Sequence, residues 1–158
     1  MKTRSGFVSN SSSSSFILHF KEMPKCVRDI EKRLSKDYYG GPFFNEYPKQ
    51  HVAERLFSAL ETGKTGDHDI QQEIADCWDE VEDPTRPQSP DTFSAPEWEE
   101  YHKKVYAWAE TKKEEILKKY QGEYFALVEF SDNDGPLDSM MEHSGCFDNF
   151  VVQRFCKH

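Results

Sequence analysis

The sequence has no apolar run long enough for a membrane-spanning helix, which needs about 20 consecutive apolar residues. Hydrophobic residues make up 36% of the 158 positions and are dispersed along the chain. No apolar signal segment opens the sequence either, because residues 1–15 are rich in serine. We therefore expect a cytoplasmic protein that makes no contact with a membrane.

Cysteine is scarce and shows no metal-binding or redox spacing. The four cysteines, which include no CxxC pair, are Cys26, Cys77, Cys146 and Cys156. Free thiols in a reducing compartment are the interpretation that we favour. A bridge between Cys146 and Cys156 stays open as an alternative if these two residues flank a turn.

Catalytic signatures are missing as well. The sequence contains no HExxH, GxSxG, Walker-type or GxGxxG pattern. Several histidines fall in expected strands or helices without a cysteine at ligand spacing; they are His19, His51, His68 and His102. The sequence therefore assigns no reaction, and we expect no cofactor and favour a non-enzymatic role without deciding it.

Aromatic residues, in contrast, are abundant. The chain has twelve Phe, seven Tyr and three Trp, and such large side chains let a few positions build a core. A chain of 158 residues fits one domain and can bury about 68–70% of its unfolded surface. The fold therefore needs neither a metal ion nor a disulfide for its stability.

Hydrophobic periodicity predicts both strands and helices. Short apolar runs predict strands at 16–20, 124–130 and 150–155, and a spacing of three to four residues predicts helices at 24–36, 48–63, 67–81, 97–120 and 137–143. Connecting segments are an aromatic loop at 38–44, a proline-rich loop at 83–96 and a polar turn at 131–135. The stripe from Trp98 to Trp108 on the longest helix is expected to be core.

These elements predict an α+β fold, a small sheet of about three strands with four main helices packed on it. In the simplest arrangement the helices cover one face of the sheet. If the helix at 137–143 joins the last two strands, these could be parallel through a right-handed crossover. We expect a single domain over 16–158, preceded by a flexible serine-rich arm at 1–15.

The opening peptide is more specific than low complexity. The stretch from Arg4 to Phe16, RSGFVSNSSSSSF, resembles the start of a loose group of bacterial and phage proteins. The later segments 129–135 and 141–143 also look like some members of that group. The resemblance implies an origin on a mobile element and a bacterial host cell, and it carries over no activity and no site residue.

Negative charge is concentrated in one stretch. The net charge is −9, yet residues 67–100 hold twelve acids against the single base Arg86. The spacing of Asp69, Glu73, Asp76 and Glu80 predicts an acidic helix face opposite Ile70, Ile74 and Val81, with its carboxylates in solvent. Such a face can occupy a groove built for phosphates, although acidic surfaces also serve solubility alone.

We therefore expect an accessory protein that binds and inhibits a host macromolecule with a basic surface, such as a nucleic-acid-processing or defence complex, without binding nucleic acid directly. The candidate contact residues are Asp69, Glu73, Asp76, Asp79, Glu80, Glu82 and Asp83. An alternative is a virion or structural accessory protein whose serine-rich arm enters a neighbouring subunit.

A second alternative is a small metal-dependent enzyme. Its candidate ligands are Asp132, Asp134, Glu142 and His143, because oxygen ligands hold Mg²⁺, Mn²⁺ or Ca²⁺ and an imidazole favours a transition metal. A calcium loop does not fit, because Phe130 and Met141 occupy its first and last ligand positions. Ordinary turn and helix-cap chemistry is the interpretation that we favour for Asp132 and Asp134.

Overall fold

A computed structural model describes residues 13–35, 47–63, 67–88, 94–143 and 145–157. The aromatic loop expected at 38–44 and most of the expected serine-rich arm lie outside the described residues. The described chain confirms the predicted α+β class, with a three-stranded antiparallel sheet and four main helices.

The sheet has the strand order β2-β1-β3, with β1 (Ser13–Phe20) in the centre. It pairs antiparallel with both β2 (Tyr124–Ser131) and β3 (Val151–Lys157). The last two strands therefore run in the same direction, as the crossover hypothesis required. They are not neighbours, however, because the first strand of the chain lies between them.

The central strand begins earlier than predicted. Ser13 pairs with Ser131 on one side and Lys157 on the other, and the next two serines, Ser14 and Ser15, are buried. The predicted boundary at Phe16 was wrong, because backbone pairing on both sides extends the strand beyond its apolar residues. Part of the serine run thus belongs to the sheet.

Five α-helices and two short 3₁₀ helices complete the described fold. They are α1 (Val27–Glu31), α2 (Lys49–Thr62), α3 (Asp67–Asp76), η3 (Trp78–Glu80), α4 (Ala95–Lys119), η4 (Asp132–Asp134) and α5 (Pro136–His143). Helix α1 ends well before the predicted boundary at 36, because the Ser35 N–H donates to the Cys146 carbonyl (3.1 Å). Helix α4 opens with a capping box in which the Ser94 N–H donates to Glu97 Oε2 (2.7 Å).

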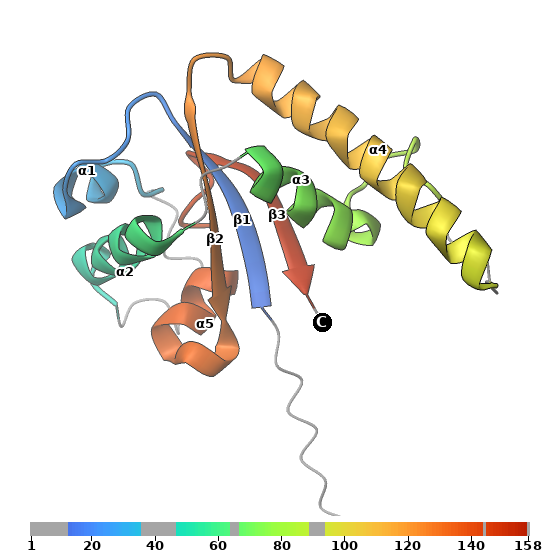
Figure 1. The fold of residues 1–158 in the computed structure, drawn as a ribbon. Coiled ribbons are helices and arrows are strands. Elements are labelled where there is room, and N and C mark those ends of the chain that lie inside the picture. Colours follow the sequence, from blue (N-terminus) through green and yellow to red (C-terminus); the bar gives the residue numbers. More distant parts are fainter. Residues whose placement is uncertain (1–12, 36–46, 64–66, 89–93, 144, 158) are drawn as a thin grey trace, which may run out of the picture.

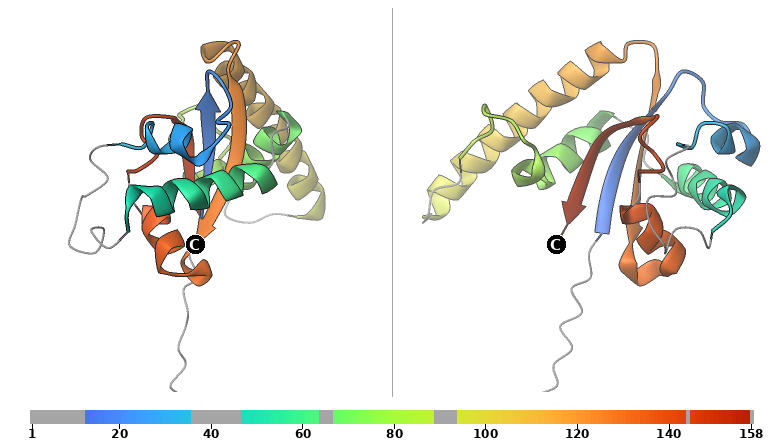
Figure 2. Two further views of the ribbon diagram at one scale, coloured as in Figure 1. Left: turned by 90° about the vertical axis from the view of Figure 1, so that its left-hand side faces the viewer. Right: turned by 180° about the vertical axis from the view of Figure 1, so that it is seen from behind.

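The helices cover both faces of the sheet, so the one-face arrangement was wrong (Figure 1). Side chains of β1 alternate: Phe16 and Leu18 join the core under α1, α2 and α5, whereas Ile17 joins the core under α3 and α4. A strand that is apolar at successive positions needs cover on both faces. The two views in Figure 2 show the sheet between these two helical layers.

A partly buried ion pair joins two helices on the first face. Arg55 on α2 donates from Nε to Asp138 Oδ1 (2.9 Å) and from a terminal nitrogen to Oδ2 (2.6 Å). Asp138 is 3% exposed, and two parallel bonds of this kind fix orientation as well as distance. The pair therefore holds α5 in place against α2.

Cys26 is exposed, whereas Cys77 and Cys146 are buried. The side chain of Cys156 lies outside the described residues, so the bridge to Cys146 that the sequence left open stays a hypothesis. Every helix within the described residues is too short or too polar to cross a lipid bilayer.

Candidate functional site

The acidic stretch is not one continuous solvent face. Asp76, Asp79 and Glu82 are exposed and Asp69 is half-buried, whereas the side chain of Glu80 lies outside the described residues. The expectation for Glu73 was wrong, because it is only 8% exposed. It follows Ile70 by three residues and precedes Cys77 by four, which places it on the inward stripe of α3.

Glu73 instead faces a cavity of about 240 Å³ at the β2 edge of the sheet. Its Oε1 accepts from Cys77 Sγ (3.6 Å), and Ser15, Arg55 and Glu129 also line this cavity. Glu73 therefore does not belong to an exposed acidic face.

Asp83 is also used inside the molecule. Its Oδ2 lies 2.5 Å from Lys112 Nζ, and its Oδ1 accepts from the Thr85 N–H (2.6 Å). The Lys112 ammonium and the Thr85 donors lower the pKa of this carboxyl to about 2. Asp83 thus anchors the segment after η3 to α4, which leaves Asp76, Asp79 and Glu82 as the exposed described acids of the predicted set.

An aromatic groove lies between α3 and α4, beside these exposed acids. It has a volume of about 260 Å³ and is lined by Ala75, Asp76, Trp78, Trp98, Tyr101, His102, Val105 and Tyr106. The Trp98 ring stacks on His102 with centroids 5.4 Å apart and meets Tyr101 edge-on at 6.0 Å. The groove is therefore walled by rings, with a carboxylate at its edge.

The expected Trp98–Trp108 core stripe is only partly buried. Tyr101, Val105 and Trp108 belong to the core under α4, but Trp98 is 44% exposed and Tyr106 is 40% exposed. Figure 1 shows the reason, since the N-terminal end of α4 reaches past the sheet and past α3. Helical spacing predicted the stripe correctly, but it could not show where the covering layer ends.

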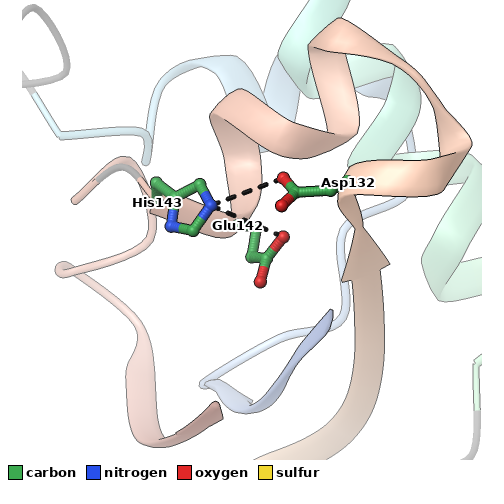
Figure 3. A group of neighbouring side chains, drawn as sticks. All are labelled: Asp132, Glu142 and His143. Atoms are coloured by element: carbon green, nitrogen blue, oxygen red, sulfur yellow. Dashed lines mark ion pairs between the residues drawn. The ribbon is translucent and has the colours of Figure 1, made fainter. Parts of the chain in front are cut away.

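A second group gathers where β2 passes into η4 and α5. Asp132, Glu142 and His143 each place one ligand atom within 4.8 Å of the others, and Figure 3 shows the two α5 side chains turned toward Asp132. His143 Nε2 lies 3.4 Å from Asp132 Oδ1 and 3.7 Å from Glu142 Oε2. Among the described residues this group excludes Asp134, the fourth predicted ligand.

The backbone that joins η4 to α5 depends on glycine. Gly135 has φ +122° and ψ 174°, a conformation that side-chain-bearing residues rarely adopt. Ser131 caps η4, because its Oγ accepts from the Asn133 N–H (3.2 Å). This turn folds α5 back so that its end approaches Asp132.

The sequence analysis missed a third feature, a histidine–carboxylate pair beside basic residues. His19 Nδ1 on β1 pairs with Glu123 Oε2, and its ring packs 4.2 Å from the Tyr120 ring. A cavity of about 370 Å³ adjoins the pair, with Lys21, Phe20, Lys32, Arg33, Asn149 and Phe150 in its lining. The antiparallel pairing of β1 with β2 brings these two side chains together, which no local pattern in the sequence indicates.

Comparison of the chain with protein-family models, with curated proteins and with solved structures finds no match. The fold defines the class, an α+β protein with a three-stranded antiparallel sheet between two helical layers. The candidate sites are therefore argued from their geometry.

Proposed function

We propose that this chain is a binding protein whose α3–α4 groove takes a basic segment of a partner protein. The observation that carries the proposal is the pair of exposed rings in the groove. Trp98, Tyr106 and Tyr124 are the exposed large hydrophobic residues of the described chain, and the first two line the groove. Tryptophan and tyrosine dominate the energetics of protein interfaces because they offer large, rigid contact area.

The negative charge beside the groove indicates that the partner segment carries positive charge. Asp76 lines the groove, and Asp79 and Glu82 are exposed in the segment that follows. A guanidinium or ammonium group seated on an aromatic face gains a cation–π attraction, and a nearby carboxylate adds an ion pair. The molecule already uses this geometry, because Arg86 Cζ lies 5.5 Å from the centre of the Trp78 ring.

The acids at the start of α4 contribute less to this charge. Glu99 pairs with Lys103 (2.7 Å) and Glu100 pairs with Lys104 (2.8 Å), all of them exposed. Paired charges of opposite sign largely cancel beyond a Debye length, ~8 Å at physiological ionic strength. The negative potential at the groove therefore depends mainly on the α3–η3 side.

The partner class follows from the negative charge and from the opening peptide. A groove of this charge repels nucleic acid and suits a protein surface that itself contacts phosphates. Because the N-terminal peptide resembles those of bacterial and phage proteins, we expect a host protein of that kind, which the chain would inhibit by occupying its basic surface.

A matched pair of variants tests the groove. A fluorescent arginine-rich peptide serves as the probe, and binding is measured by anisotropy at low and physiological salt. We expect Trp98→Ala with Asp76→Lys to weaken binding at least tenfold, as the loss of one well-placed aromatic contact does. The control combines Tyr124→Thr with Glu54→Lys, which alters an equally exposed ring on β2 and an exposed acid on α2.

Equal binding by the groove variant and the wild type contradicts the proposal. An equal loss in the control variant also contradicts it, because the peptide would then sense net charge alone. Partners captured from host lysate should depend on the same two groove positions and should be insensitive to the control substitutions.

A further inference from the structure

A buried carboxylate at the end of α5 has one oxygen without a hydrogen bond. Glu142 is 1% exposed, and its Oε1 accepts from Ser14 Oγ (3.3 Å). Its Oε2 receives no hydrogen bond and lies 3.7 Å from His143 Nε2. Burying a carboxylate oxygen costs free energy unless a cation or a donor compensates it, so this oxygen marks the place of a positive ligand.

We propose that Asp132, Glu142 and His143 bind one divalent transition-metal ion. A metal ion about 2.1 Å from each ligand atom, with tetrahedral angles, separates neighbouring ligand atoms by about 3.4 Å. The observed separations from His143 Nε2 are 3.4 Å to Asp132 Oδ1 and 3.7 Å to Glu142 Oε2. The three side chains thus need only small movements to enclose an ion.

The surroundings of Glu142 hold its carboxylate in position for this role. Ser14, on the central strand β1, is fully buried and donates to Oε1. A terminal nitrogen of Arg154 on β3 in turn lies 3.5 Å from Ser14 Oγ. Such outer contacts orient metal ligands, and their loss typically weakens metal binding by about 10–100-fold. The serine run of the opening peptide therefore supports the site directly.

The ligand set indicates the metal class. One imidazole nitrogen with two carboxylate oxygens suits Zn²⁺, Mn²⁺ or Fe²⁺, whereas Ca²⁺ takes about 6–8 oxygen ligands. Three protein ligands leave at least one coordination position open. The ligand oxygens Asp132 Oδ1 and Glu142 Oε2 are buried, whereas the side chain of His143 is 50% exposed.

The full-length chain, stripped of metal with a chelator, is titrated with Zn²⁺ and, separately, with Mn²⁺. We expect one equivalent to bind by calorimetry and native mass spectrometry. Asp132→Asn and His143→Ala should each weaken binding at least tenfold, and Ser14→Ala should weaken it by about 10–100-fold. Asp134→Asn, in the same turn but outside the cluster, should bind as the wild type does.

Co²⁺ provides a readout independent of affinity, because thiolate ligands produce intense charge-transfer absorption whereas nitrogen and oxygen ligands do not. We expect the Co²⁺ complex to lack the thiolate bands. The partly exposed positions Asp132 and His143 carry the test, because Glu142→Gln could disturb folding.

Three results would overturn the proposal. These are the absence of stoichiometric binding of both Zn²⁺ and Mn²⁺, an unchanged affinity in Asp132→Asn and His143→Ala, and thiolate bands in the Co²⁺ spectrum.

Discussion

Asp83 shows how one residue of an acidic stretch can serve the fold. Its carboxylate bridges Lys112 on α4 and Thr85 in the following turn. The Trp108 indole N–H also donates to Thr85 Oγ1 (3.3 Å), so these side chains connect the proline-containing segment to the core under α4. The stretch therefore divides into acids that hold the structure and acids that face solvent.

The lowered pKa of Asp83 predicts a specific acid dependence of stability. On folding, the pKa of the Asp83 carboxyl falls from 3.8 to about 2. The largest cause is the hydrogen bond from Lys112, and the hydrogen bonds from Thr85 add to it, because all of them stabilise the charged form. A group with a lowered folded pKa stabilises the protein above its unfolded pKa and loses that effect as the pH falls through the folded value. Asp83→Asn should therefore melt below the wild type near neutral pH, and the difference should narrow as the pH falls toward 2 and close only below that pH.

Calorimetry across this pH range measures the difference between the two melting temperatures. Glu82→Gln is the control, since it removes a neighbouring carboxylate that is exposed, and it should melt close to the wild type near neutral pH. A difference between Asp83→Asn and the wild type that stays constant from neutral pH to pH 2 would refute the assignment.

Of the glycines in the described part of the chain, Gly63 at the end of α2 lies closest to the sheet. A Cβ at Gly63 would lie 2.9 Å from the Ala59 carbonyl oxygen and 3.0 Å from the Leu127 carbonyl oxygen. Both are backbone atoms, so neither can turn away as a side chain would. The φ of Gly63 is −66°, an ordinary value, so glycine is required here by space rather than by conformation.

Gly63→Ala should destabilise the fold by about 1–3 kcal/mol, the usual cost of forcing extra atoms into a packed contact. Urea denaturation monitored by tryptophan fluorescence gives this free energy. Gly145→Ala is the matched control, because its new Cβ would meet the side chain of the exposed Asp148, which can move. A cost at Gly63 no larger than that at Gly145 would show that α2 can shift away from β2.

The molecule as a whole has two cores separated by one thin sheet. Ile17 and Leu18 are adjacent on β1 and completely buried, yet they belong to different cores. A sheet covered on one face would leave one of them near solvent. Because helices cover both faces of the sheet, every side chain of the central strand from Phe16 to Leu18 is buried in a core.

Ile17→Ala and Leu18→Ala should each lower the free energy of unfolding by about 2–5 kcal/mol, because each leaves a cavity in a closed core. Equilibrium denaturation measures both changes. Tyr124→Thr, at an exposed position of β2, should change stability by no more than about 0.5 kcal/mol. A nearly neutral Ile17→Ala would mean that α3 and α4 do not cover the second face.

The features that the sequence alone determined are those encoded by near neighbours in the chain. Periodicity placed the three strands and the main helices, because a helix or strand repeats its buried side within a few residues. The apolar run at 16–20 identified a buried strand. The helix predicted at 97–120 begins instead at Ala95, where Ser94 and Glu97 form a capping box. The composition of the 129–143 segment pointed to Asp132, Asp134, Glu142 and His143, of which the structure brings together all but Asp134.

Only the tertiary structure decided which of these pieces meet. It set the strand order β2-β1-β3 and placed helices on both faces. It buried Glu73, exposed Trp98, and brought Ser14 to Glu142 across 128 residues of sequence. These outcomes depend on packing between segments that are distant in the sequence. A local pattern shows which side of a helix or strand is buried, but it does not specify which other element covers that side.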